Sequence, residues 1–469
     1  MGEDSDVPNV GGIRTDVVEA LRALAIPNLR WPGGCFADEY HWRDGIGPRD
    51  QRPRMVNSHW GDVVEDNSFG THEFLHLCEL LGADPYVNGN FGSGTVREMK
   101  EWVEYLTRAD DSPMASLRRA NGRDEPWEVP FFGIGNEAWG CGGNMRAEAY
   151  ADLARQYATY VRNHGENQVY RIAAGANSDD YSWTEALMKA LGCLGCNREV
   201  AGPFQAVSLH YYTMTGPWQD KGAATVFTDD EYDRTIAAAH HVEELLTRHS
   251  TVMDRFDPYK KVGLVLDEWG TWWNAEPGTN PGFLYQQNTL RDALVAAVHF
   301  DAFHRHADRL VMANIAQTVN VLQAMLLTDP AGGEMVKTPT FHVFEMNKGH
   351  HDATSLPTHV AGPSRTVAGR DVPVISASAS TKDGTVLVSV TNVDLDAPLE
   401  VELQVRGAAL SGATGRLLWA DSADAYNRPG AAGTVSPVRL EHLEQTRAGL
   451  RLTLPPHSFA TVSATIQSA

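Results

Sequence analysis

Two glutamates, each at the end of a short apolar run, are the residues of this chain best suited to do chemistry. The runs are Gly133-Ile134-Gly135-Asn136-Glu137 and Leu264–Trp269, which contains Glu268. Cleaving a glycosidic bond needs one protonated carboxyl group to release the leaving oxygen and one ionised carboxylate beneath the sugar ring. Either glutamate alone is as readily a solvated loop charge. As a pair, they predict a glycoside hydrolase with Glu137 and Glu268 as its catalytic residues.

The residues before both glutamates are typical of buried parallel strands. Phe131–Ile134 and Val262–Leu266 are continuous apolar runs, as expected for strands covered on both faces. In a parallel barrel, residues just past the C-terminal ends of the strands gather at one mouth, where such folds carry their active sites. Asn136 adds an amide that could bond the 2-hydroxyl of a sugar beside Glu137.

Along most of the chain, apolar strand candidates alternate with amphipathic helical segments, as in repeated βα units. The helical 3.6-residue period is present over 16–24, 71–81, 147–163 and 235–248. Seven strands are predicted, one fewer than a closed eight-stranded barrel requires. We therefore predict a (β/α)8-type TIM barrel over residues 1–350, one strand short of the full number. The predicted strands are 28–31, 85–88, 131–135, 171–175, 206–210, 262–267 and 310–315.

The pattern changes after a helix predicted over 340–347. Short segments with alternating apolar and polar residues, separated by Gly, Asp and Pro, indicate half-exposed antiparallel strands. The fold class is therefore α/β, with a C-terminal antiparallel β-sandwich over 351–469. Its clearest predicted strands are 385–391, 399–405, 450–454 and 459–466.

Composition restricts the partners of the chain. A formal charge of −21 over 469 residues argues against binding to nucleic acid phosphates. Apolar stretches long enough for a membrane span, about 20 residues, are absent from the sequence. The acidic start Met1–Asp6 does not resemble a secretory signal. These features predict a cytoplasmic protein without nucleic acid or membrane partners.

The five cysteines are Cys35, Cys78, Cys141, Cys193 and Cys196. An odd number spread through a large chain predicts reduced thiols rather than a disulfide framework. Cys193 and Cys196 form a lone C-x-x-C without a second pair, which favours a loop after a helix over a zinc or redox site. No metal site is predicted.

A longer motif carries a family resemblance that covers nearly the whole chain. The segment Leu29–Pro48, with Trp31-Pro32-Gly33-Gly34-Cys35 at its centre, and the motifs 135–137 and 267–269 closely resemble the α-L-arabinofuranosidases of glycoside hydrolase family 51. The resemblance implies a barrel joined to a β-sandwich and a retaining mechanism without metal or organic cofactor. Glu137 would be the acid/base and Glu268 the nucleophile.

The resemblance also implies a substrate and an assembly. The enzyme would remove terminal α-L-arabinofuranosyl units from arabinoxylan, arabinan or their oligosaccharides, as part of hemicellulose degradation, and would form a homo-oligomer, possibly a hexamer. The resemblance further implies that the first barrel strand and a sugar-binding glutamate of the family lie ahead of the position of Met1, so we expect the first barrel strand to be missing from this chain.

Further sugar contacts follow from motif position or from aromatic character. Two of them keep a second interpretation: Cys35 as a small residue in a tight turn, and His210 as a hydrogen-bonded core residue. Aromatic rings stack on sugar faces, which is why Trp60 and Trp273 are candidates. The full predicted set of substrate contacts is Asn136, Cys35, Trp60, His210, Tyr212, Gln317 and Trp273.

Two alternative functions are compatible with these residues. An endo-acting xylanase or β-glucanase of the same family would share both glutamates. A truncated, non-catalytic carbohydrate-binding relic would keep the aromatic residues, but two intact glutamate motifs argue against it. A dinucleotide enzyme is disfavoured, because Gly89, Gly92 and Gly94 lack the G-x-G-x-x-G spacing.

Overall fold

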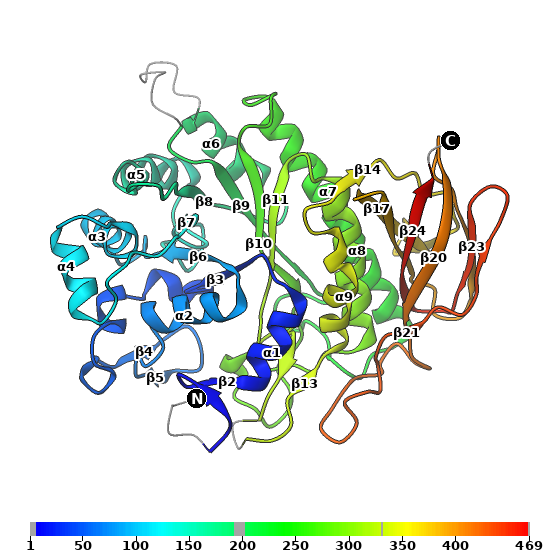
Figure 1. Ribbon diagram of the computed structural model, residues 1–469, viewed down its shortest axis with the longest axis horizontal. Coiled ribbons are helices and arrows are strands. Elements are labelled where there is room, and N and C mark those ends of the chain that lie inside the picture. Colours follow the sequence, from blue (N-terminus) through cyan, green and yellow to red (C-terminus); the bar gives the residue numbers. More distant parts are fainter. Residues whose placement is uncertain (1–5, 192–201, 330–331, 468–469) are drawn as a thin grey trace. The chain divides into compact units, whose positions relative to one another are not determined.

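The computed structural model describes residues 6–191, 202–329 and 332–467 (Figure 1). The chain forms two compact units, each built from several segments. The first unit draws on Met1–Tyr211, Thr247–Glu268 and Arg309–Asn314, and the second on Tyr212–Leu246, Trp269–Asp308 and Ile315–Ala469. The predicted division between residues 350 and 351 stays a prediction.

A seven-stranded sheet in the order β11-β10-β9-β8-β7-β6-β3 forms the framework of the barrel. Adjacent strands from β3 to β9 pair in parallel. Each of the seven strands predicted from the sequence is present, with ends shifted by at most a few residues. The strands are β3 (Asn28–Trp31), β6 (Asp84–Gly89), β7 (Phe131–Ile134), β8 (Tyr170–Asn177), β9 (Ala206–Thr213), β10 (Gly263–Thr271) and β11 (Leu310–Ile315).

The barrel is nearly closed. Strands β3 and β11 are the two edges of the sheet, and among the described residues no further strand pairs with either. Across the opening, the Asn314 side-chain amide donates to Asn28 Oδ1 at 2.6 Å. The predicted TIM-barrel class is confirmed, with seven strands.

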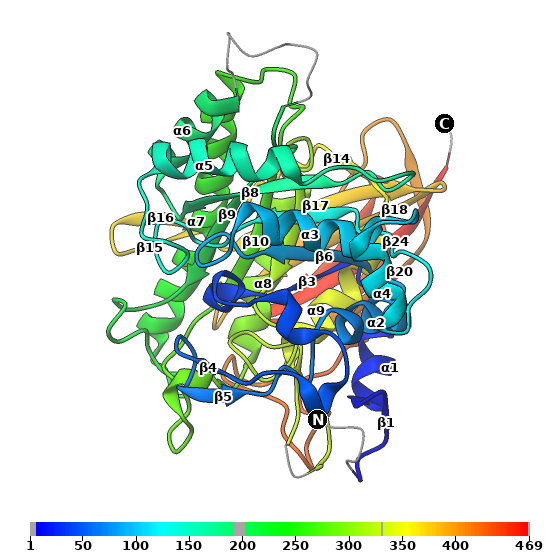
Figure 2. The same cartoon turned by 90° about the vertical axis from the view of Figure 1, so that its left-hand side faces the viewer.

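Helices cover the sheet of the first unit (Figure 1, Figure 2). Helix α2 packs on β3 and β6, α5 on β7 and α6 on β8. The sequence explains the ends of α2, because Glu73 accepts the backbone N–H of Gly70 at 2.8 Å and Gly82 ends the helix with φ +68°. The helices are α1 (Thr15–Leu24), α2 (Thr71–Leu81), α3 (Val96–Thr107), α4 (Pro113–Ala120), α5 (Ala147–Tyr160) and α6 (Tyr181–Leu191).

The second unit contains the predicted antiparallel sandwich. A six-stranded sheet has the order β14-β17-β18-β24-β20-β21, and a three-stranded sheet the order β19-β23-β22. The principal strands are β17 (Ile375–Lys382), β18 (Thr385–Asn392), β19 (Leu399–Leu403), β20 (Ala409–Leu418), β23 (Leu450–Leu454) and β24 (Ser458–Gln467); the shorter ones are β14 (Thr354–Leu356), β21 (Val438–Arg439) and β22 (Leu443–Gln445).

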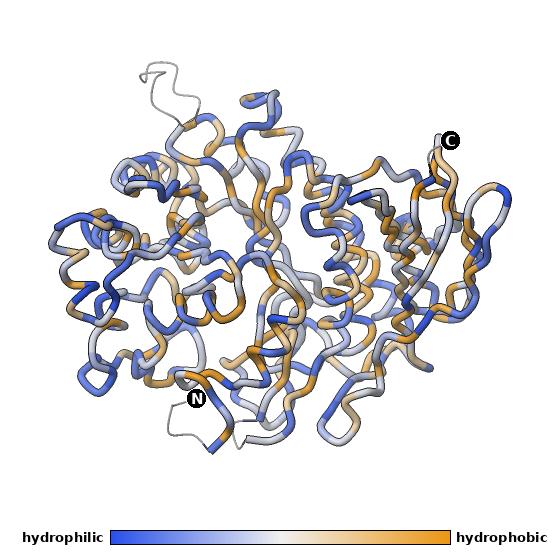
Figure 3. The backbone as a smooth tube through the Cα atoms, viewed as in Figure 1, coloured by the Kyte–Doolittle hydropathy of each residue, from blue (hydrophilic) through white to orange (hydrophobic). Residues whose placement is uncertain are grey.

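Alternating side chains from both sheets form the sandwich core. Val386 and Val390 of β18 lie in one buried cluster with Leu450, Leu452 and Leu454 of β23. Figure 3 shows hydrophobic stretches along the sandwich strands and hydrophilic residues in the turns. The period-two pattern read from the sequence therefore identified this core correctly.

Long helices complete the second unit. Helix α8 (Leu290–Arg305) packs on β17 and β18, and α9 (Pro339–Asn347) packs on α8. Helix α7 (Asp229–Asp254) includes the helix predicted over 235–248 and contributes its last turns to the first unit. No helix in the described ranges is both long and apolar enough to cross a membrane.

Candidate active site

Glu137 projects from a strained turn directly after β7. Its own φ is +42°, and Gly135 before it has φ +82°. A Cβ atom at Gly135 would lie 2.6 Å from Phe91 Cβ, so glycine is required there. A non-glycine residue at positive φ costs about 1–3 kcal/mol and persists where the surroundings hold it. Neighbouring residues therefore hold this turn in its strained conformation.

Asp38 is the residue that supports this turn. Its Oδ2 accepts the backbone N–H of Asn136 at 2.8 Å, and its Oδ1 accepts those of Phe91 and Gly92 at 2.6 and 3.0 Å. Burial raises the pKa of Asp38 to about 6, although the three hydrogen bonds oppose the rise. Sequence reasoning missed Asp38, and the only available signal was its place in the Leu29–Pro48 motif.

Glu268 lies in β10, a strand buried along its whole length. Arg30 of β3 donates from Nη1 to Glu268 Oε1 at 3.0 Å and from Nη2 to Asn136 Oδ1 at 2.7 Å. Burial disfavours the charge of Arg30, but Asp267, Tyr86 and Glu268 raise its pKa above the usual value. Arg30 therefore stays charged and gives Glu268 a charge-assisted hydrogen bond. It was not among the predicted site residues.

His210 of β9 bridges the carboxyl groups. Its Nδ1 donates to Glu137 Oε1 at 2.8 Å and lies 3.5 Å from Glu268 Oε2, while its Nε2 lies 3.1 Å from Asp267 Oδ1. Burial opposes protonation, but Glu268, Asp267 and Glu137 together raise the pKa of His210 to about 10. His210 is therefore a buried cation that carries a proton on each ring nitrogen.

The spacing of the two glutamates selects one class of hydrolysis. An oxygen of Glu137 and an oxygen of Glu268 lie within 4.8 Å of each other. Retaining glycosidases hold their carboxyl groups about 5–5.5 Å apart, and inverting enzymes about 6.5–9.5 Å apart. The described site matches the retaining arrangement.

Asn136 presents a buried donor to the site. Arginine is only a donor, so the side-chain atom of Asn136 that contacts Arg30 must be its oxygen. The amide nitrogen of Asn136 therefore does not contact Arg30. That nitrogen is buried and has no hydrogen-bond partner. A hydroxyl group of a bound sugar would satisfy it.

Cys35 does not carry a free thiol. It forms a disulfide with Cys141, which follows Glu137 in the same turn. The Cys141 and Cys35 sulfur atoms lie 3.5 and 4.0 Å from Glu137 Oε2. The prediction of reduced thiols was wrong for this pair. The two cysteines are 106 residues apart in the sequence, and only the folded barrel brings them together. Cys78 is free and buried, and Cys193 and Cys196 lie outside the described residues.

Trp60 lies beside the segment that carries Cys35. The side chain of Asn57 accepts its backbone N–H at 3.0 Å, and a Cβ atom at Gly34 would lie 3.7 Å from its indole nitrogen. The ring is half-buried, so part of its face is open to a ligand.

Three predicted contacts belong to the second unit and are described within it. The Tyr212 ring packs edge-on against Trp272 at 4.9 Å between centroids, and Gln317 is exposed directly after β11. Trp273 is only 2 % exposed and donates its indole N–H to Asp292 at 2.7 Å. Its predicted role as a sugar contact stays a prediction.

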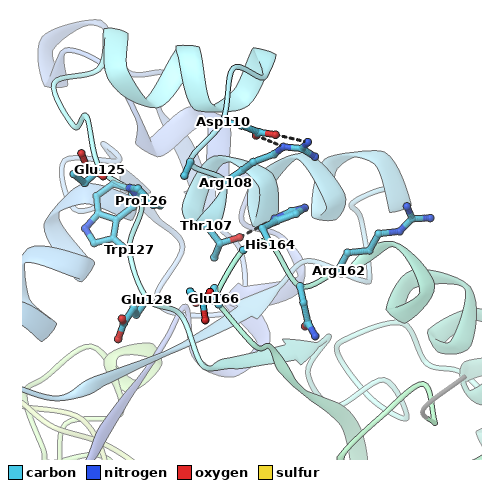
Figure 4. Close-up of a pocket in the computed structure, with 14 residues that line it drawn as sticks. Thr107, Arg108, Asp110, Glu125, Pro126, Trp127, Glu128, Arg162, His164 and Glu166 are labelled. Carbon is cyan, nitrogen blue, oxygen red and sulfur yellow. Dashed lines mark hydrogen bonds and ion pairs between the residues drawn. The ribbon is translucent and has the colours of Figure 1, made fainter.

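A separate cavity of about 740 Å³ lies in the first unit. It is lined by the segments 107–110, 125–128 and 162–167, which precede β7 and β8 or follow α3. Figure 4 shows Arg108 paired with Asp110 and His164 bonded to Thr107 at its wall. These loops lead into the N-terminal ends of strands, the face opposite to the catalytic mouth of a barrel. This cavity is not the catalytic pocket.

A parallel barrel with two paired carboxyl groups, one after β7 and one within β10, together with an antiparallel sandwich, defines a barrel glycoside hydrolase. Two family models match the chain: the α-L-arabinofuranosidase 1 domain over residues 20–213 and the α-L-arabinofuranosidase C-terminal domain over residues 267–458. The chain belongs to the α-L-arabinofuranosidases of glycoside hydrolase family 51 and is an enzyme of that class.

Named relatives agree with this family. The chain is 51% identical to an intracellular exo-α-L-arabinofuranosidase of Bacteroides ovatus, covering 98% of this chain and 88% of that protein. It is 32% identical to a probable α-L-arabinofuranosidase C of Aspergillus terreus, covering 84% of this chain and 78% of that protein.

Solved structures agree as well. The GH51 arabinofuranosidase of Xanthomonas axonopodis pv. citri superposes with a TM-score of 0.95 at 47% identity, covering 99% of this chain and 92% of that one. The arabinose complex of the Thermotoga maritima enzyme gives 0.82 at 28% identity, with coverages of 99% and 92%.

Proposed function

We propose that this enzyme removes terminal α-L-arabinofuranosyl residues by double displacement, with Glu268 as nucleophile and Glu137 as acid/base. The observation that carries the assignment is the different environment of the two carboxyl groups. Glu268 accepts a hydrogen bond from the buried Arg30 cation, which favours the ionised nucleophile. Glu137 instead faces His210 on one oxygen and the disulfide on the other.

The proposed acid/base role requires a transferable proton on Glu137. Arg30 and His210 are cations, and Asp267, Glu137 and Glu268 are carboxylates, so the net charge is −1 with all three ionised. A proton on Glu137 makes the cluster neutral. His210 donates to Oε1, so the proton that Glu137 transfers sits on Oε2.

In the first step, Glu268 attacks the anomeric carbon while Glu137 protonates the departing oxygen. A β-linked glycosyl-enzyme forms, and Glu137 is left ionised beside His210, which stabilises its new charge. In the second step, Glu137 deprotonates a water molecule that attacks the same carbon and releases Glu268. The configuration of the sugar is retained.

Asn136 is proposed to bind the 2-hydroxyl group. Its amide nitrogen is buried without a hydrogen-bond partner, while its oxygen accepts from Arg30. A hydrogen bond there would strengthen as positive charge develops on the ring. Trp60 is proposed as an aromatic wall, and Tyr212 and Gln317 as further contacts.

The substrates are proposed to be arabinoxylan, arabinan and their oligosaccharides, attacked at terminal units. The Bacteroides ovatus relative is named an exo-acting enzyme and intracellular, which supports exo action and a cytoplasmic location here. A homo-oligomer, specifically a hexamer, is proposed on the family resemblance alone. Light scattering on the purified chain tests it.

Hydrolysis of an aryl α-L-arabinofuranoside tests the roles of the two glutamates. Glu268→Ala and Glu137→Ala should each lower kcat by at least about a thousandfold. With azide, Glu137→Ala should form the α-azide through the glycosyl-enzyme, whereas Glu268→Ala should form the β-azide by direct displacement.

Glu148→Ala, which changes an exposed glutamate of α5, is the control and should keep full activity. Exchange of the two azide anomers between the variants would reverse the assignment. Full activity in either variant would overturn it.

A further inference from the structure

Cys35, Cys141 and Glu137 form a compact group of potential metal ligands. The two sulfur atoms and a carboxylate oxygen lie within 4.8 Å of one another. In the described state the sulfurs are joined as a disulfide and bind nothing. Their reduction would leave two thiols beside a carboxylate, a donor set suited to a thiophilic divalent cation.

We propose that the reduced enzyme binds Zn²⁺ through Cys35, Cys141 and Glu137, and that the ion silences the acid/base. The disulfide thus protects the active site from the metal. The inhibitory part of this proposal rests on the proposed role of Glu137, whereas the metal site itself does not.

The distances suit a tetrahedral ion. Zn–S bonds of about 2.3 Å and Zn–O bonds of about 2.0 Å place sulfur and oxygen about 3.5 Å apart. The observed separations from Glu137 Oε2 are 3.5 Å to Cys141 and 4.0 Å to Cys35. Two zinc-bound sulfurs lie about 3.8 Å apart, a spacing that side-chain rotation would reach across the 5.6 Å between the Cα atoms.

The surroundings leave one oxygen of Glu137 free for the ion. His210 donates to Oε1 at 2.8 Å, so Oε2 is the oxygen that faces both sulfurs. A hydrogen bond to the second oxygen of a carboxylate ligand is the usual outer support of a metal site. The Glu137 side chain is 16% exposed, which provides a path for the ion and for a water molecule as fourth ligand.

The chemistry balances with a small dithiol as reductant. The dithiol supplies two electrons and two protons, closes to a cyclic disulfide and leaves a thiol on each cysteine. Zn²⁺ then displaces both thiol protons into solvent. The metal occupies Oε2, which is the oxygen that must carry the transferable proton, so hydrolysis stops.

Two competing sites are weaker. The other potential ligand group, Glu137 with His210 and Glu268, lacks sulfur and includes a histidine that carries protons on both nitrogens. Cys78 is buried, and burial raises the pKa of its thiol to about 12, so it does not readily supply a thiolate.

Cobalt binding tests the site without reference to activity. The enzyme carries Cys193→Ser and Cys196→Ser throughout, because these two thiols would also bind metal. It is reduced with a dithiol, freed of the dithiol by anaerobic gel filtration and titrated with Co²⁺. We expect one ion per chain with a thiolate-to-cobalt charge-transfer band, and no band before reduction.

Variants identify the ligands. Cys35→Ser and Cys141→Ser should each weaken Co²⁺ binding by at least about a hundredfold. A residue that only hydrogen-bonds to a metal ligand would cause a smaller loss. Glu137→Ala should weaken it as well, whether or not Glu137 is the acid/base. Cys78→Ser is the control and should keep the band. A reduced enzyme without the band would overturn the site.

Zinc inhibition tests the consequence. Zn²⁺ should inhibit aryl arabinofuranoside hydrolysis in the reduced enzyme at concentrations at least about tenfold lower than in the oxidised one. Equal inhibition of both forms would place the ion away from the sulfurs and overturn the proposal. Residual hydrolysis in Glu137→Ala equal to wild type would instead overturn the proposed acid/base role and leave the cobalt result standing.

Discussion

Replacing Arg30 with lysine separates the geometry of the guanidinium from its charge. Arg30 donates to Glu268 at 3.0 Å and to Asn136 at 2.7 Å through two different nitrogens. A lysine ammonium is a single compact charge and does not reproduce this fork. Arg30→Lys should therefore keep the buried cation while losing at least one of the two hydrogen bonds.

The structure sets the size of the effect. A hydrogen bond to a charged group contributes about 1.5–3 kcal/mol, and about 1.4 kcal/mol corresponds to tenfold in rate. Loss of the bond to Glu268 should lower kcat/KM by about 10- to 150-fold. Lysine is a better choice than alanine, because alanine would remove one partner of the buried Arg30–Glu268 ion pair, which costs about 3–5 kcal/mol of stability.

The assay is kcat/KM on an aryl α-L-arabinofuranoside, with circular dichroism and urea unfolding to show that the variant is folded. Arg43→Lys is the matched control, since Arg43 bonds Glu101 at 2.7 Å with 42% of its side chain exposed. Exposed ion pairs contribute only about 0.2–1 kcal/mol, so this variant should keep wild-type activity. A folded Arg30→Lys enzyme within about twofold of wild-type kcat/KM would refute the reasoning.

Two further predictions concern His210 and the turn after Glu137. Free histidine titrates near pH 6.5 and His210 has a pKa of about 10, so its protonation stabilises the fold fully below about pH 6.5 and less as pH rises toward 10. The urea midpoint of wild type should exceed that of His210→Gln most at pH 6, and a difference that does not shrink by pH 10 would contradict this. A Cβ atom at Gly142 would lie 1.7 Å from the Asn136 carbonyl oxygen, whereas at Gly140 the nearest atom is 3.7 Å away. Gly142→Ala should therefore displace the turn and lower kcat by about a hundredfold, while Gly140→Ala stays active; equal kcat values would show that the turn tolerates the added atom.

The sequence alone determined the elements of this protein and its two candidate catalytic carboxyl groups. All seven barrel strands and the sandwich strands β18, β19, β23 and β24 were predicted, because continuous apolar runs and period-two alternation are local consequences of burial on two faces or one. Glu137 and Glu268 were found because each follows such a run, and strand order then brings them together.

Only the tertiary structure decided how the two carboxyl groups differ. Arg30 lies 238 residues from Glu268 in sequence, and the Leu29–Pro48 motif that contains Arg30 and Asp38 does not show which of its side chains reach the carboxyl groups. The same limit explains the error at Cys35, predicted as a thiol but joined to Cys141. Hydrogen bonds, charge coupling and disulfides depend on distances in space, and those distances exist only after the strands have assembled.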